Sequence, residues 1–198
     1  MHGHMVIKGL LNMLLELRKI DATLHNLDPE GLFVSTNGTK LILVDLLSIS
    51  FKGMPVLAMP TRTMPFSNQD LKEHEQTGYH RQERTMWSVG MMILQLFVGS
   101  DLVQCLRTNQ DAIEVLAHVS DELGNRFYTL IKALMFDVRF EIIKETLDGG
   151  ILDDPGRVAK SLRHVGDKIK DSIFVEEMLE AKSERAHSFE YTLISADG

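Results

Sequence analysis

Four positions in the first quarter of the chain raise the question of whether they form a site that binds Mg²⁺ and phosphate groups. His25 and Asn26 lie in the stretch LHNLDPEG, which ends at Gly31, and Asp45 follows the apolar run KLILV. A carboxylate at that place can ligate Mg²⁺, which prefers oxygen ligands and completes its shell with nucleotide phosphates. Among the four, only Asp45 has a carboxylate, and one carboxylate without a partner ligand makes a weak magnesium site. We therefore expect no metal-dependent catalysis here.

Short elements around these positions must hold them in place. The apolar runs GLFVS and KLILVD are separated by the turn signal TNG, which predicts a small β-hairpin over residues 32–44. Before the hairpin, apolar residues at helical spacing predict an amphipathic helix over residues 5–23. After it, residues 48–82 contain several prolines and glycines, which predict a long loop without a long helix.

The second half of the chain is predicted to be helical. The stretch RTMWSVGMMILQLFVG is apolar almost all round, which predicts a helix over residues 84–98 that is buried on every side. Trp87 and Gly90 in this helix are predicted to be structural core. A helical extension is expected over residues 151–188. Asn109 and Ser120 are predicted to be the cap residues at the starts of two further helices. Another helix is predicted from near Val138 to the DGG at 148–150. Pro155 is predicted to lie just inside the start of the helical extension.

Composition limits the class of protein. The chain has 198 residues, of which 44% are hydrophobic, so it can bury a sizeable core as one domain with a helical appendage. Its formal net charge of -7 argues against sequence-independent binding of nucleic acid or anionic membranes. A single cysteine, Cys105, excludes an internal disulfide and suits the cytoplasm, and the scattered histidines predict no zinc site. The apolar N-terminal stretch is too short and too polar to insert into a membrane.

The order of these elements resembles the C-terminal lobe of a eukaryotic protein kinase, over residues 5–147. The family's catalytic loop reads His-Arg-Asp-Leu-Lys-Pro-Glu-Asn, and LHNLDPEG is similar to it in register. Asp45, Leu46 and Leu47 stand where the family has Asp-Phe-Gly. In the predicted core helix, Trp87 and Gly90 match the family's Asp-x-Trp-Ser-x-Gly; its serine is matched by Ser88, and Thr85 replaces its aspartate.

The resemblance implies that phosphoryl transfer has been lost. In protein kinases the loop aspartate accepts the substrate's proton, and the loop asparagine and the activation-segment aspartate hold two magnesium ions. Asn26 stands in place of the first, and Gly31, without a side chain, in place of the second. The N-terminal lobe, with its glycine-rich loop and lysine, has no counterpart in this sequence. We therefore expect no enzyme activity, no cofactor and no tight binding of ATP.

The same resemblance predicts a protein-binding surface. The face that an N-terminal lobe would cover lies near Leu46 and Leu47, and two consecutive leucines beside a loop need an apolar cover. Helix 5–23 and the extension are the candidates within the chain, and another protein is the candidate outside it. The groove beside the helix of residues 109–119 is the other expected contact. His25 stands where the family has an arginine, and it is more simply read as a loop residue.

Three functional interpretations follow. The first is a non-catalytic interaction or scaffold module with a pseudokinase fold, related to the kinase non-catalytic C-lobe domain, whose partners are other proteins. The second is a fragment or split half of a serine/threonine protein kinase that binds ATP and transfers phosphate with a missing N-lobe. The third is an all-helical domain unrelated to kinases, which the absence of a β-pair over residues 32–44 would support.

Overall fold

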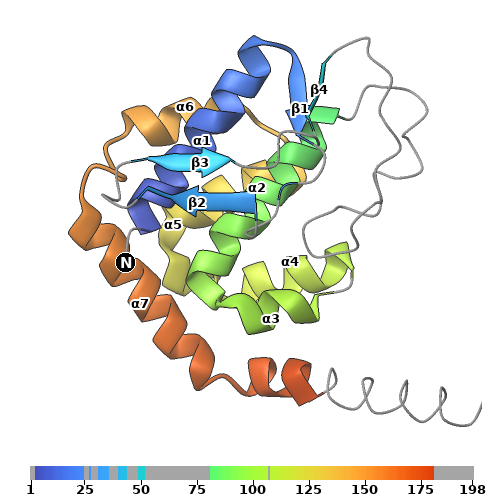
Figure 1. Ribbon diagram of the computed structural model, residues 1–198. Coiled ribbons are helices and arrows are strands. Elements are labelled where there is room, and N and C mark those ends of the chain that lie inside the picture. Colours follow the sequence, from blue (N-terminus) through green and yellow to red (C-terminus); the bar gives the residue numbers. More distant parts are fainter. Residues whose placement is uncertain are drawn as a thin grey trace, which may run out of the picture.

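The computed structural model of the chain describes residues 3–24, 27, 31–35, 40–43, 49–51, 81–106 and 108–180. Within them the protein is mainly helical, with two small antiparallel strand pairs (Figure 1). This confirms the prediction of a mainly α protein with a small β-hairpin. The elements in chain order are α1 (Gly3–Lys19), β1 (Ala22–Leu24), β2 (Leu32–Val34), β3 (Leu41–Leu43), β4 (Ile49–Phe51), α2 (Arg81–Val98), α3 (Ser100–Cys105), α4 (Asn109–His118), α5 (Ser120–Lys132), η4 (Ala133–Asp137), α6 (Glu141–Asp148) and α7 (Pro155–Lys170).

Helix α2 is the axis of the hydrophobic core, as its all-round apolar sequence predicts. It packs against α1, α5, α7, η4 and β1, so that each of its faces has a neighbour (Figure 1). Met86 and Ile93 are completely buried, and Trp87 is only 1% exposed. The Trp87 ring meets Phe136 edge-on, with 5.5 Å between ring centroids and an interplanar angle of 87°. This is the geometry that aromatic quadrupoles favour.

Gly90 lets the π-helical turn η4 approach α2 closely. A β-carbon at Gly90 would collide with Cγ of Met135 and lie 3.2 Å from Cβ of Leu134. Both residues predicted as structural core, Trp87 and Gly90, are buried. The close approach explains why a helix-weakening glycine stands in the middle of the most buried helix.

The strands form two antiparallel pairs. β2 pairs with β3, with Leu32 opposite Leu43 and Phe33 opposite Ile42, which is the predicted hairpin. The absence of this hairpin would have supported the third interpretation, an all-helical domain, and the hairpin is present. β1 pairs with β4, with Leu24 opposite Ile49. All three residues of β1 are buried, so β1 belongs to the core, whereas Phe51 at the end of β4 is exposed.

The first helix ends earlier than predicted, and its prediction over residues 5–23 is wrong at the C-terminal end. α1 ends at Lys19, and Asp21 adopts a left-handed backbone conformation with a φ of 49°. Aspartate tolerates this conformation, which turns the chain out of the helix. Ala22 and Thr23 then pair with β4. The predicted loop over 48–82 is likewise wrong at Ile49–Phe51, which form β4, and at residues 81–82, where α2 begins. Residues 52–80 lie outside the described residues.

Two predicted helix caps are also wrong. The N-cap of α4 is Thr108, one residue before Asn109; its hydroxyl accepts from the Asp111 N–H at 3.1 Å, and the Asp111 carboxylate accepts from the Thr108 N–H at 3.0 Å. This is a capping box closed by aspartate. The N-cap of α5 is Val119, not Ser120, and it makes no side-chain cap.

The helix predicted from near Val138 begins later. Val138 has a left-handed φ of 48° and ends η4, so α6 starts only at Glu141. An α-helix cannot continue through a left-handed residue, because its carbonyl points away from the helix axis. The helical run expected after Ser120 is also divided, since Gly124 has a φ of 70° inside α5.

The C-terminal extension packs along the helical body (Figure 1). α7 begins at Pro155, as predicted, and its N-cap Asp154 accepts from the Arg157 N–H at 3.0 Å. α7 contacts α1, α2 and α5. The prediction of one helix up to residue 188 is wrong at residues 171–172, where α7 ends, and helix resumes over 173–180. Residues 181–188 lie outside the described residues.

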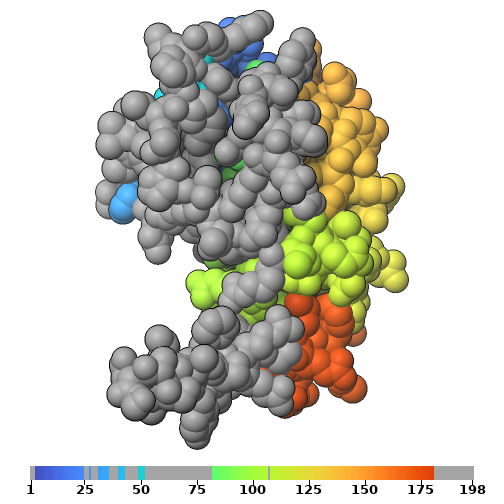
Figure 2. Space-filling model, turned by 90° about the vertical axis from the view of Figure 1, so that its right-hand side faces the viewer, coloured from blue at the N-terminus to red at the C-terminus, as the bar shows by residue number. Residues whose placement is uncertain are grey.

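A side-chain contact holds the second part of the extension against α4. His118 Nε2 lies 2.8 Å from the Ser172 hydroxyl, and its ring stacks on Phe174 with 4.6 Å between centroids. In the view of Figure 2, the yellow-green surface of α3 and α4 lies between the orange surface near α6 and the red-orange end of the extension. The second part of the extension is thus placed beside α4.

Candidate functional site

The strand pairs bring together the end residues of the two predicted site segments. The chain from Leu24 to Leu32 and the chain from Leu43 to Ile49 both lead from one strand pair to the other. Leu24 is opposite Ile49 and Leu32 is opposite Leu43, so the two segments start and end as neighbours.

Most of the predicted site residues lie outside the described residues. These are His25 and Asn26 in the first segment and Asp45, Leu46 and Leu47 in the second. The predictions made for them, including the binding surface at Leu46 and Leu47, stay predictions. Gly31 is described: it is partly buried and directly precedes β2.

Leu27 anchors the first segment to the core. It is 1% exposed, although the sequence predicts a loop on both sides of it. A buried leucine supplies about 1.5 to 3 kcal/mol of burial free energy. The segment that resembles a catalytic loop is therefore fixed to the core in its middle.

Thr85 connects the start of this segment to the core helix. Its hydroxyl accepts from the Leu24 N–H at 3.1 Å and donates to the Leu24 carbonyl at 3.0 Å. Thr85 is 2% exposed, so both hydrogen bonds lie in the dry interior. An aspartate at this position could accept a hydrogen bond from the N–H. When ionised, however, it has no proton to donate, so its carboxylate would be repelled by the carbonyl oxygen. Threonine satisfies both backbone groups of Leu24.

The outer face of the β2–β3 hairpin is apolar and exposed. Phe33 and Ile42 are directly opposite each other, 55% and 46% exposed, and Val34 beside them is 41% exposed. Leu32 and Leu41 pack against the core instead. We call the cross-strand pair Phe33 and Ile42 the hairpin face. It carries no charged or polar side chain. Val34 follows Phe33 along the strand and therefore points to the opposite side.

Sequence analysis did not single out the hairpin face, although the signal was present. A hairpin with one solvated face alternates apolar and polar residues, whereas Leu32–Val34 and Leu41–Leu43 are apolar at every position. An all-apolar strand is typical of a sheet covered on both sides. Among the described residues, Leu32 and Leu41 on one side pack against the core, and the hairpin face on the other side is about half exposed.

The described residues offer no site for metal chemistry. Within them, no group of three or more histidine, cysteine, aspartate or glutamate side chains is placed to hold a metal ion. Cys105 is buried, and its thiol donates to the Asp101 carbonyl at 3.0 Å. In the same part of the chain, no helix is long and apolar enough to cross a membrane.

Comparison with protein family models, with curated proteins and with solved structures finds no significant match to this chain.

Proposed function

We propose that this chain is a non-catalytic protein-interaction or scaffold module with a fold like the C-terminal lobe of protein kinases. The order of elements supports the likeness: a helix, a loop with short strands, a central buried helix and further helices. So does the link between two motif regions that are far apart in the sequence, since Thr85 is bonded to Leu24, although both residues differ from the family's aspartate and histidine. Neither motif region alone is specific for a kinase-like fold. The contact between them makes the ordered set of motifs more specific.

The absence of catalysis is part of the proposal. Gly31 stands at the position of the metal-holding asparagine, and glycine has no side-chain oxygen to offer a magnesium ion. Asn26 stands at the position of the catalytic base, and a neutral amide has no useful basicity at physiological pH. A split half of a kinase would obtain the glycine-rich loop and the lysine from a second chain, but Asn26 would still leave it without the catalytic base. We place the module in the cytoplasm, because its single cysteine forms no internal disulfide.

The hairpin face is the observation that carries the proposal. Phe33 and Ile42 expose about half of their side chains on a strand pair that is apolar throughout. Clustered aromatic and aliphatic side chains are the anchors that contribute most to protein interfaces. In a kinase-like arrangement, this hairpin is next to the surface that a missing N-lobe would cover. We therefore propose that a partner protein covers the hairpin face.

The test compares two isoleucines of similar exposure. Ile42 on the hairpin face is 46% exposed, and Ile113 on α4 is 42% exposed. Tagged wild type, Ile42→Asp and Ile113→Asp would be purified from the native cell and their partners quantified by mass spectrometry. Both variants should keep the wild-type circular dichroism spectrum, because neither side chain is in the core. We expect Ile42→Asp to lose a defined set of partners that Ile113→Asp retains.

The result that contradicts the proposal is equally specific. If Ile42→Asp keeps every partner of the wild type, the hairpin face binds nothing in the cell. The double variant Leu46→Ser/Leu47→Ser tests the neighbouring segment in the same experiment. If partner loss occurs only in Ile113→Asp, the contact lies beside α4 instead.

A further inference from the structure

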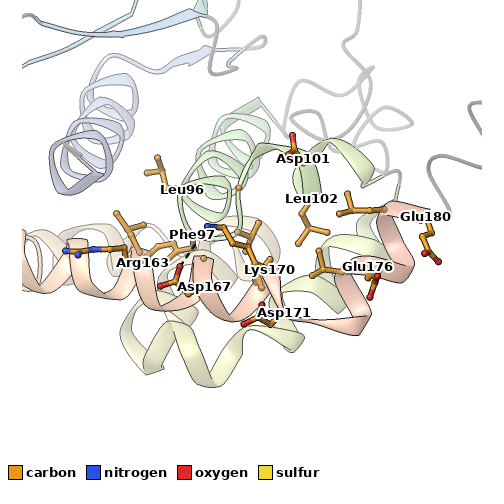
Figure 3. Close-up of a pocket in the computed structure, with 17 residues that line it drawn as sticks. Leu96, Phe97, Asp101, Leu102, Arg163, Asp167, Lys170, Asp171, Glu176 and Glu180 are labelled. Atoms are coloured by element: carbon orange, nitrogen blue, oxygen red, sulfur yellow. Dashed lines mark ion pairs between the residues drawn. The ribbon is translucent and has the colours of Figure 1, made fainter.

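A groove of about 930 Å³ lies between the end of α2, helix α3 and the C-terminal extension (Figure 3). One wall is α7 between Leu162 and Asp171, and the other is formed by α3 and residues 175–180. The extension lies outside the part of the chain that resembles a kinase. This groove is therefore independent of the hairpin face, and its function does not depend on the function proposed above.

The floor of the groove is apolar. Phe97, Leu102 and Ile169 are buried at its base, and Leu179 is 38% exposed at its edge. Of these four side chains, Leu179 is the one that leaves substantial apolar area in water, and covering such area contributes about 25 cal/mol per Å². The floor can therefore receive apolar side chains of a bound segment.

The rim of the groove is acidic. It carries five carboxylates against two cations, Arg163 and Lys170, which gives a formal charge of -3. Lys170 already lies 4.0 Å from the Asp167 carboxylate (Figure 3). Among the described residues, no ion pair is formed by the remaining four rim carboxylates, which belong to Asp101, Asp171, Glu176 and Glu180.

The dimensions of the groove match a short helix. Its α7 wall runs from Leu162 to Lys170, which corresponds to about 12 Å at the helical rise per residue. Two turns of a bound helix have about this length and present apolar residues at positions i, i+3, i+4 and i+7. The lining residues come from helices and their ends, not from a strand, so no sheet edge is available there to pair with an extended peptide.

We propose that this groove binds an amphipathic helix of a partner protein, with an apolar face against the floor and lysine or arginine residues beside the acidic rim. Charge complementarity selects this occupant: opposite charge accelerates association and disfavours acidic partners. A second copy of this chain is a poorer occupant, because its formal net charge is -7. Arg163 and Lys170 of α7 already belong to the groove wall.

The test uses defined peptides and the full-length protein. The probe is a fluorescein-labelled helix of roughly 18 residues, with leucines at the i, i+3, i+4 and i+7 spacing and lysines elsewhere. One control peptide has the same composition in scrambled order, and the other has glutamate in place of lysine. Fluorescence anisotropy should show the probe binding at least about tenfold more tightly than either control, and more weakly at high salt.

Two matched pairs of variants locate the binding. A β-carbon at Gly166 lies 3.7 Å from the Phe97 carbonyl oxygen, an ordinary contact, so Gly166→Ala should bind like wild type. Gly166→Leu extends into the groove and should weaken binding about tenfold. The double change Glu176→Lys/Glu180→Lys reverses the rim and should weaken binding about tenfold as well. Asp148→Lys, on α6 outside the groove, should have no effect.

Several results would overturn the proposal. Equal binding of the scrambled peptide would mean attraction by charge alone, and equal binding by Gly166→Leu and wild type would place the peptide elsewhere. If only a chain ending at Glu180 binds the probe, residues 181–198 occupy the groove instead. If sedimentation shows a dimer that Gly166→Leu dissociates, a second copy is the occupant. Ile42→Asp should leave peptide binding unchanged, so failure of one proposal is distinguishable from failure of the other.

Discussion

Helix α2 and the β2–β3 hairpin have the same kind of sequence and different surroundings. Both are apolar at nearly every position in their middle. In α2 every face has a neighbour, and its apolar residues from Met86 to Leu94 are no more than 4% exposed. In the hairpin, Leu32 and Leu41 face the core, whereas Phe33 and Ile42 face solvent and are 55% and 46% exposed.

The difference shows how an unpartnered surface can be recognised. An all-apolar element is typical of burial on every side, and α2 reaches that state within the chain. The hairpin does not reach it within the described residues. Where sequence pattern and burial disagree, a covering layer is lacking, and a binding partner can supply it. The following predictions test this comparison, from the largest expected effect to the smallest.

The largest effect is expected for Trp87→Ala. Trp87 is 1% exposed and packs edge-on against Phe136, so truncation leaves a large cavity at the core axis. The free energy of unfolding should fall by about 3 to 5 kcal/mol, measured by urea denaturation. An unchanged unfolding midpoint would mean that Trp87 is on the surface and that the kinase-like alignment of α2 is wrong.

A smaller loss is expected for Thr85→Val. Valine keeps the shape of threonine but leaves the N–H and carbonyl of Leu24 without their partner in the interior. The free energy of unfolding should fall by about 1 to 3 kcal/mol, the cost of unpaired buried polar groups. Thr85→Ser keeps the hydroxyl and serves as the control. Equal losses in the two variants would show that packing, and not hydrogen bonding, connects α2 to β1.

The comparison is sharpest between two isoleucines. Ile93 in α2 is completely buried, and Ile42 on the hairpin face is 46% exposed. Ile93→Val should lower the free energy of unfolding by about 0.5 to 1.5 kcal/mol. Ile42→Val, at an exposed position, should change it by less than about 0.5 kcal/mol. If Ile42→Val costs as much as Ile93→Val, the hairpin face is covered within the chain.

No measurable effect is expected from nucleotide. A ligand present at about a hundred times its dissociation constant would stabilise the protein by about 2.7 kcal/mol. Because Gly31 and Asn26 lack the metal-holding and basic groups, millimolar Mg-ATP should leave the melting temperature unchanged. A rise of several degrees that Asp45→Ala abolishes would contradict this prediction and favour the split-kinase interpretation.

Local signals in the sequence determined part of this fold. The all-round apolar pattern predicted α2, the turn TNG predicted the hairpin, and Pro155 marked the start of α7. Each depends on periodicity or on the geometry of one turn, which neighbouring residues determine by themselves. The degenerate residues at Asn26 and Gly31 are likewise evident from the sequence alone.

Long-range contacts decided the rest. β1 and β4 are three residues each and far apart in the chain, and they are strands only because they pair with each other. The bonds between Thr85 and Leu24 join residues 61 positions apart, and no pattern near either residue indicates them. Which hairpin face meets solvent, and where the acidic groove lies, depend on how whole elements pack. Local preference cannot specify these features, because it acts over only a few residues, whereas the free energy of packing depends on the complete arrangement.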